Sequence, residues 1–250
     1  TMSQSIGAQL FTSDIAAKIP SLVENLFQSL PARSQAALVT DLVVNRNGAD
    51  LVLTLSEDEV IPISLLSVSS VQDQINRHGG SMTERLNTQI HRLPAEQIDR
   101  TKRIQSLSRS LSTLTGNQDN GRELFVQACQ LCHQLKGQGK LVGPQLDGIG
   151  NRGVERLLED ILDPNRNVDK AFHTQSVSLD NGDVLSGLYR REEGNLIFLV
   201  NVAGQEFSVN KNEITDRTTS HKSLMPENFS DLLKKEQISD LVTFLLNSVK

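Results

Sequence analysis

The sequence has few aromatic residues and few cysteines. Its 250 residues contain no tryptophan and one tyrosine, so aromatic residues make up only 4%. Proteins that bind single-stranded nucleic acid stack the bases on aromatic side chains, which argues against that function. No run of about 18 apolar residues is present, so no transmembrane segment is expected in this chain. No basic tract stands out and the net charge is −5, so nucleic acid is not an expected partner either.

The remaining composition is typical of a globular protein. Hydrophobic residues make up 37% and charged residues 22%, which is enough for a buried core beneath a solvated surface. A chain of this length suits one large domain or two modest ones.

The two cysteines, Cys129 and Cys132, carry the clearest chemical signal. One pair cannot build a disulfide framework, which needs more pairs. A structural zinc site usually needs four Cys or His ligands, and only His133 lies nearby. The cysteines instead belong to a C-x-x-C-H string that ends at His133.

The C-x-x-C-H string from Cys129 to His133 is typical of covalent attachment of a c-type haem. Two thiols on one helical turn can each form a thioether with a haem vinyl group, and His133 can then bind the iron as the proximal ligand. One alternative is a thioredoxin-like redox pair, which needs a βαβ context that this sequence lacks. The other is a chance string.

Flanking residues support the haem interpretation. The carbonyl of Pro144 can accept the second ring N–H of His133 and so select its tautomer. Met225, in a Ser-Leu-Met-Pro segment, offers a soft thioether, and ligation by His and Met is the pattern of cytochromes c. His173 and His221 are alternative distal ligands. His221 lies only four residues before Met225, so the same loop could offer either residue.

Two short segments resemble the crossing terminal helices of class I cytochromes c. Gly121 and Phe125 stand in the first segment, and Leu241 and Phe244 stand in the second. The resemblance implies that Gly121 allows close approach of the helices and that Phe125 packs against the second helix and belongs to the haem-binding residues.

The resemblance extends to the residues around the haem. Gly143-Pro144-x-Leu146 is similar to the segment that covers the proximal side in this family. Arg152 stands where the family often places an arginine for a haem propionate, and a planar, permanently charged guanidinium suits a carboxylate.

A β-rich insertion at about residues 172–220 departs from small class I cytochromes. Residues 174–179, 184–189, 196–200 and 206–209 alternate as strands, which predicts a small antiparallel sheet or barrel of about four strands. With this insertion ahead of Met225, residues 117–249 resemble the Planctomycete/Verrucomicrobium-type haem-binding domain. Further signatures of that resemblance, in order, are residues 141–144, 158–165, 180–182, 223–226 and 240–241.

Residues 1–116 show helical patterns and contain no catalytic or ligand-binding motif. Apolar residues recur at helical spacing over residues 15–30 and 36–43, and further helices are expected at residues 50–55, 65–75, 86–91 and 94–114. Helix pairs in series resemble a HEAT-like solenoid, a spacer or interaction surface. The polar stretch at residues 115–120 separates the predicted domains, 1–116 and 117–250. The expected fold class is mainly α, a HEAT-like region followed by a cytochrome c fold.

We expect an electron-transfer domain with one haem c, and we assign no catalytic residue. The resemblance implies redox partner proteins or a fused dehydrogenase domain. It also implies a periplasmic or otherwise exported location, and the missing leader suggests a piece of a longer protein. A haem enzyme or a gas or redox sensor with a labile distal ligand is the alternative, and an interaction module with a structural haem is the third.

Overall fold

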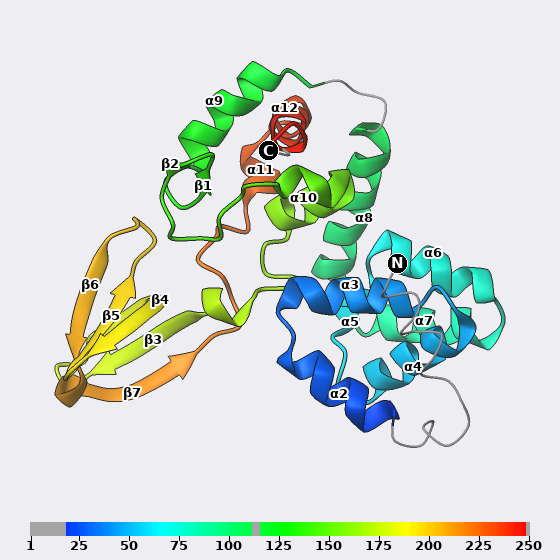
Figure 1. Cartoon of the computed structure of the whole chain (residues 1–250), viewed down its shortest axis with the longest axis horizontal. Coiled ribbons are helices and arrows are strands. Elements are labelled where there is room, and N and C mark those ends of the chain that lie inside the picture. Colours follow the sequence, from blue (N-terminus) through cyan, green and yellow to red (C-terminus); the bar gives the residue numbers. More distant parts are fainter. Residues whose placement is uncertain (1–18, 112–115, 249–250) are drawn as a thin grey trace. The chain divides into compact units, whose positions relative to one another are not determined.

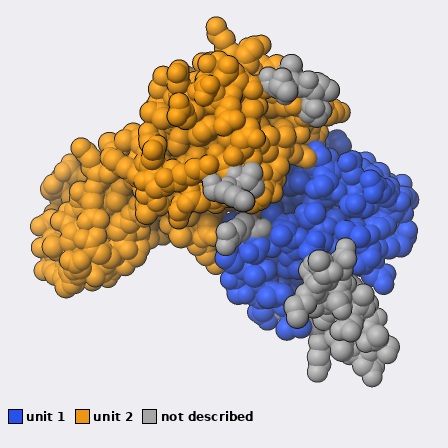
Figure 2. Space-filling model, turned by 45° about the horizontal axis from the view of Figure 1, so that its top comes forward, with its two compact units in different colours: residues 1–102 blue, residues 103–250 orange. Residues whose placement is uncertain are grey.

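The computed structural model describes residues 19–111 and 116–248. Its contacts divide the chain into two compact units, residues 1–102 and residues 103–250 (Figure 2). This division falls inside helix α8 (Ala95–Leu111), before the predicted boundary at residue 116. Residue 115 of the predicted linker lies outside the described residues, and the predicted domain limits stay a prediction.

The described part of unit 1 is helical, which confirms the N-terminal helical region. Its helices before α8 are α2 (Ile19–Ser29), α3 (Ala32–Leu42), α4 (Arg46–Glu57), α5 (Ile63–Leu66), α6 (Ser69–His78) and α7 (Ser81–His91) (Figure 1). Residues 15–18 and 112–114 of the predicted helices lie outside the described residues. None of the described helices of the chain is long and apolar enough to cross a membrane.

The single helix predicted at residues 65–75 was wrong, because two helices occupy this stretch. The hydroxyl of Ser67 donates to the carbonyl of Ser64 at 2.7 Å, and the Ser67 N–H donates to the same oxygen. This local bond competes with helical pairing and ends α5. Val68 is extended, with φ −69° and ψ 130°, and α6 begins after it.

Unit 2 contains four helices after α8 in its described residues. They are α9 (Gln118–Ala128), α10 (Gly153–Leu162), α11 (Phe229–Leu232) and α12 (Lys235–Leu246), with 3₁₀ turns η1 (Ile149–Arg152), η2 (Lys170–Phe172) and η3 (Lys211–Glu213). Their apolar faces form one hydrophobic core that includes Phe125, Leu157, Leu158 and Leu241.

Helices α9 and α12 cross in close contact (Figure 1). A Cβ on Gly121 would overlap the carbonyl oxygen of Asp240 and would lie 2.8 Å from the Cβ of Phe244, so only glycine fits this crossing. Beside it, the rings of Phe125 and Phe244 lie 5.6 Å apart at 46°. The small residue therefore brings two helices together around an aromatic contact.

The insertion forms one antiparallel sheet of five strands, and the expectation of about four was too low. The strands are β3 (Thr174–Leu179), β4 (Val184–Glu193), β5 (Leu196–Val200), β6 (Glu206–Asn210) and β7 (Ile214–Thr219), in the order β6-β5-β4-β3-β7. Strand β7 was not predicted. It is an edge strand with five of its six residues exposed, so its sequence does not alternate between apolar and polar residues.

A second, two-stranded sheet follows the C-x-x-C-H string directly. It consists of β1 (Gln134–Leu135) and β2 (Gln138–Gly139). Lys136 and Gly137 form the turn with φ of 51° and 75°, and the Lys136 N–H donates to Asp147 Oδ1 at 2.6 Å. Asp147 therefore closes this turn.

Candidate functional site

The C-x-x-C-H string forms a tight turn at the end of α9. Cys129 is the C-terminal cap of this helix, and its carbonyl accepts hydrogen bonds from the N–H groups of Cys132 at 3.1 Å and His133 at 2.9 Å. Both thiols are free. Burial raises the pKa of Cys129 to about 12, with Cys132 adding to the shift, so this thiol is protonated at neutral pH. A redox-active thiol pair needs the opposite shift, toward the thiolate.

The imidazole of His133 is held by one hydrogen bond. Its Nδ1 lies 2.8 Å from the carbonyl oxygen of Pro144, the acceptor that the sequence suggested. A carbonyl only accepts, so Nδ1 carries the proton and the Nε2 lone pair is free for a ligand bond. Burial lowers the pKa of His133 despite this hydrogen bond, which keeps the ring neutral at pH 7.

Gly143 packs directly against the imidazole ring. A Cβ at this position would lie 2.7 Å from Cε1 and 3.1 Å from Nδ1 of His133, closer than side chains approach. The loop is also tied to the attachment turn, because the N–H groups of Val142 and Gly143 both donate to the carbonyl of Cys132, at 3.0 and 2.8 Å. Absence of a side chain at residue 143 therefore lets the loop reach the ring.

Met225 lies in the loop between β7 and α11. Its side chain is partly buried against the hydrophobic core of unit 2, as is that of Cys129. Its N–H donates to Ser223 Oγ at 3.0 Å, and the N–H of Ser223 donates to Asn165 Oδ1 at 2.7 Å. The loop is therefore anchored to the segment after α10.

The alternative distal ligands, His173 and His221, contact each other. Their rings meet edge to face with centroids 5.0 Å apart, and His173 Nε2 lies 3.2 Å from the carbonyl oxygen of Val168. Burial is the main cause that lowers the pKa of His173. His221 is exposed, unlike the partly buried Met225.

The remaining predicted residues fall on the helical core. Phe125 is buried, and Leu146 is partly buried against the same core. The N–H of Leu146 donates to the carbonyl of Gln134 at 2.8 Å, which ties this segment to β1. Both residues thus lie in the core against which Cys129 and Met225 pack.

Arg152 pairs with a carboxylate that the sequence analysis did not single out. Its Nη1 lies 3.0 Å from Oδ2 of Asp160, and Nε of Arg156 lies 3.8 Å from the other oxygen. Burial raises the pKa of Asp160 to about 6, although both arginines oppose this shift. The four-residue spacing of Arg156 and Asp160 on a helix was the available signal.

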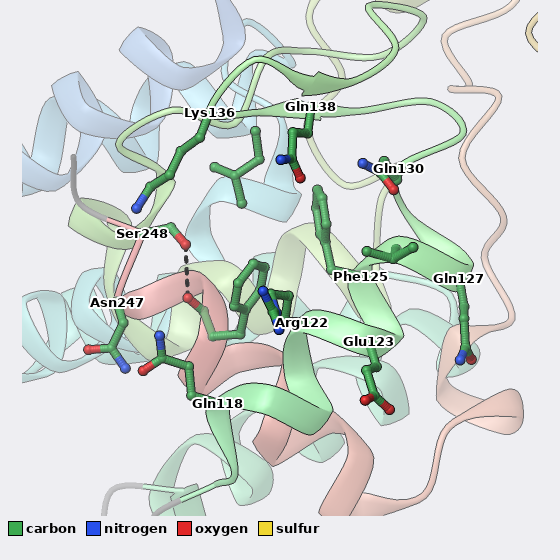
Figure 3. A pocket seen from close by; sticks show the side chains of 13 residues that line it. Gln118, Arg122, Glu123, Phe125, Gln127, Gln130, Lys136, Gln138, Asn247 and Ser248 are labelled. Carbon is green, nitrogen blue, oxygen red and sulfur yellow. Dashed lines mark hydrogen bonds between the residues drawn. The ribbon is translucent and has the colours of Figure 1, made fainter.

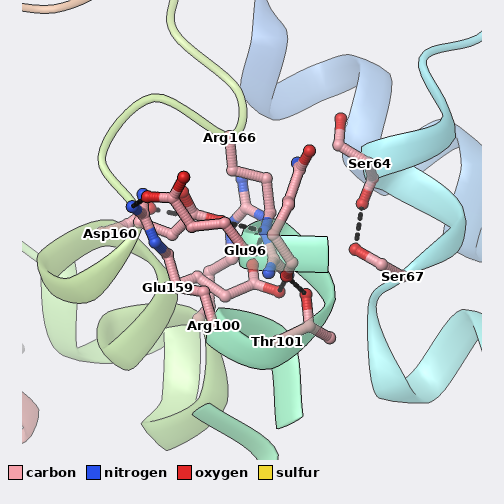
Figure 4. Close-up of polar contacts among 11 residues, drawn as sticks. Ser64, Ser67, Glu96, Arg100, Thr101, Glu159, Asp160 and Arg166 are labelled. Carbon is pink, nitrogen blue, oxygen red and sulfur yellow. Dashed lines mark hydrogen bonds and ion pairs between the residues drawn. The ribbon is translucent and has the colours of Figure 1, made fainter. Parts of the chain in front are cut away.

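A buried ion cluster continues along the same helix (Figure 4). Glu159 is 2% exposed and accepts from Arg166 at 2.9 Å, and Arg166 also donates to Asp163 at 2.8 Å. Buried charges are tolerated only when they are paired in this way. Asp163 is also the C-terminal cap of α10.

A cavity of about 530 Å³ lies between α9, the β1–β2 turn and the end of α12 (Figure 3). Phe125 and Phe244 line its apolar side, and Arg122 and Lys136 are among its polar lining residues. Neither cysteine, nor His133, nor Met225 lines it. Gln130, inside the C-x-x-C-H string, does line it, so the cavity borders the attachment turn.

The donor set around Cys129 suits a c-type haem. It comprises two free thiols three residues apart, a neutral imidazole with a free Nε2, and a thioether sulfur on an anchored loop. Imidazole and thioether are the axial ligands found in cytochromes c. Leu146, Ile149 and Val154 add partly buried apolar side chains against the same core, as a porphyrin requires.

Comparison with known proteins agrees with this chemistry. No curated protein matches the chain. The match to a protein family begins with α9 and ends at the last residue of β4, so it includes the attachment turn and excludes the Met225 loop. It supports a haem-binding, electron-transfer role and confirms the predicted cofactor, covalently bound haem c with its iron. Residues 118–193 of this chain match the family model for cytochrome c.

Proposed function

We propose that the chain is a one-haem electron carrier whose haem is attached through Cys129 and Cys132 and bound by His133 and Met225. The observation that carries this proposal is that Met225 and Cys129 are partly buried against the same hydrophobic core. Bound haem supplies a ferric/ferrous couple that takes up and releases one electron. No substrate needs to reach the metal when both axial positions are filled.

The protein residues set the properties of that couple. The carbonyl of Pro144 holds the His133 ring through Nδ1, which fixes its orientation and raises its basicity as a ligand. Met225 favours the ferrous state, because a thioether is softer than a second imidazole. Phe125 and Leu146 contribute to the apolar core that excludes water.

Arg152 is the proposed partner of a haem propionate. Its guanidinium has a carboxylate neighbour in Asp160, and a second carboxylate from the haem would suit its fork of donors.

The wider assignment also rests on resemblance. The five-stranded insertion between the attachment turn and Met225 supports the Planctomycete/Verrucomicrobium-type haem-binding domain. From that resemblance follow a HEAT-like role for unit 1, an exported or periplasmic location, and electron exchange with redox partners or a fused dehydrogenase domain.

The distal ligand can be tested in protein produced by a host that attaches haem c. The Met225→Ala variant should keep its haem but show a lower reduction potential, because the thioether no longer favours ferrous iron. His221→Ala and His173→Ala are the matched controls and should keep the wild-type potential. Visible spectra of both oxidation states, potentiometry and the mass of the attached haem provide the measurements.

Three results would contradict the proposal. An unchanged potential in Met225→Ala would remove this residue from the iron. Rapid binding of carbon monoxide or cyanide by a high-spin wild-type haem would instead indicate an open distal site, as in an enzyme or a sensor. A haem that cannot be reduced reversibly would point to a structural role.

A further inference from the structure

Strand β4 carries a β-bulge whose extra residue is Arg190. In the pairing with β5, Tyr189 lies opposite Leu199 and Arg191 lies opposite Phe198, so Arg190 has no partner residue. Bulges redirect single side chains and occur often beside functional sites. The side chain of Arg190 therefore does not follow the alternation between the two faces of the sheet that its neighbours on β4 show.

The guanidinium of Arg190 reaches the loop in front of the proximal histidine. Its Nη2 donates to the carbonyl oxygen of Leu141 at 2.7 Å and to that of Val142 at 3.1 Å. The next two residues of this loop are Gly143, which packs on the His133 ring, and Pro144, which accepts from its Nδ1. One side chain of the insertion thus holds the segment that orients His133.

Apolar contacts hold the same two parts together. Val142, Leu188 and Val200 form a small buried cluster, and Cys132 packs against it. A Cβ on Gly204, in the turn between β5 and β6, would lie 3.2 Å from Cγ2 of Val142. The five-stranded sheet therefore packs against the loop that contains Leu141 and Val142, and Arg190 adds hydrogen bonds to this loop.

We propose that Arg190 is a positioning residue for the proximal haem ligand, and that through it the β-insertion acts on the haem site. This inference rests on the proposed function, with His133 as the ligand. By fixing the carbonyls of Leu141 and Val142, Arg190 holds the Pro144 carbonyl at the Nδ1–H of His133. A looser loop weakens that hydrogen bond and with it the basicity of the ligand.

The neighbouring arginine provides a matched control. Arg191 lies on the same strand, but its guanidinium pairs with Glu193 and Glu206 and stacks over the ring of Phe198, with centroid distance 4.0 Å. It forms no hydrogen bond to the loop in the described part of the chain. Loss of Arg191 removes a cation from β4 without releasing the loop.

The test compares Arg190→Met, Arg190→Lys and Arg191→Met in the haem-loaded, reduced protein. In Arg190→Met, the backbone amides of Val142 and Gly143 should exchange with solvent about tenfold faster, since the hydrogen bonds that hold their loop are lost. The Nδ1–H proton resonance of His133 should move upfield, which reports a weaker hydrogen bond. Arg190→Lys keeps a cationic donor and should restore part of both signals, and Arg191→Met should match the wild type.

Two outcomes in folded variants would overturn the inference. One is unchanged exchange and an unchanged His133 resonance in Arg190→Met; the other is an equal change in Arg191→Met, which would indicate general loosening of the sheet. If Arg190→Met does not fold but Arg191→Met does, values of both signals in Arg190→Lys that depart from the wild type in the expected directions support the positioning role of Arg190, and failure of both methionine variants to fold overturns it. A wild-type protein without covalent haem would refute the proposed function itself, and its mass and spectrum reveal this before any variant is made.

Discussion

The pKa of Asp160 is shifted by the surroundings of its carboxyl group in the fold. Its carboxylate lies between Arg152 and Arg156, yet burial dominates and raises its pKa from 3.8 to about 6. Two nearby arginines would by themselves lower the pKa. The desolvation of one carboxylate therefore outweighs two opposite charges, so this residue should contribute a pH dependence of its own.

Replacement of Asp160 by asparagine should flatten the dependence of stability on pH. Between about pH 4 and pH 6 the folded protein retains a proton on Asp160 that the unfolded chain releases. Because the folded state binds more protons there, the free energy of unfolding contributed by Asp160 falls as pH rises through this window. Chemical denaturation of the haem-loaded wild type and of Asp160→Asn, at steps from pH 4 to pH 7, measures the difference.

Glu206 gives a control of the opposite sign. Its exposed carboxylate accepts a hydrogen bond from Arg191, which lowers the pKa of Glu206. The stabilising effect of such a group is present at neutral pH and is lost as pH falls through the lowered pKa. If Asp160→Asn and wild type gave parallel profiles, burial of Asp160 would have no energetic consequence.

The crossing of α9 and α12 is the element-level feature that brings the two ends of unit 2 together. Gly121 has the carbonyl of Asp240 in the space where a side chain would lie. The same crossing places Phe125 against Phe244, and α9 leads directly into the attachment turn at Cys129. A shift of α9 would therefore move the cysteines relative to the core.

Replacement of Gly121 by alanine should destabilise the protein by about 1–3 kcal/mol, the usual cost of forcing extra volume into a packed contact. The exposed residue Gln127 lies on the same helix, so Gln127→Ala is the control and should change stability little. Urea denaturation of both haem-loaded variants gives the two free energies. A Gly121→Ala protein as stable as wild type would show that the helices can separate without loss.

At the scale of the whole molecule, each of the two units has its own main hydrophobic core among the described residues. One core belongs to unit 1 and includes Val39, Leu53 and Ile75, and the other belongs to unit 2 and includes Leu158 and Leu241. The candidate haem site lies in unit 2, where Cys129 and Met225 pack against this second core and Cys132 packs against the small cluster of Val142, Leu188 and Val200. A ligand stabilises the part of a protein that binds it in the folded state, so haem should stabilise unit 2 selectively.

Heating should therefore unfold the haem-loaded protein in two steps. In the Cys129→Ala, Cys132→Ala double variant, which cannot form either thioether, the step of unit 2 should move down by about 10 °C or more while the step of unit 1 stays in place. Calorimetry of both proteins checks this, with mass spectrometry to verify that covalent haem is lost. A single transition that shifts as a whole would mean that the two cores unfold together.

Sequence reasoning worked best where the signal is local. Cys129, Cys132 and His133 are adjacent along the chain, and the turn that joins them involves few other residues. The cofactor could therefore be predicted without a structure. The prediction of one helix at residues 65–75 was wrong for a reason that is also local, because the hydroxyl of Ser67 bonds to the carbonyl of Ser64 and ends helix α5. Strand β7 was missed because an exposed edge strand carries no apolar pattern.

The sequence by itself determined the attachment chemistry and the helical and strand periodicities, because both depend on residues a few positions apart. Only the tertiary structure decided which distant groups meet. It placed Arg190 on the carbonyl of Val142, 48 residues away, and packed Met225 and Cys129 against one core. Such contacts depend on the β-bulge in β4 and on the closure of a long insertion, and neither leaves a periodic signal in the sequence.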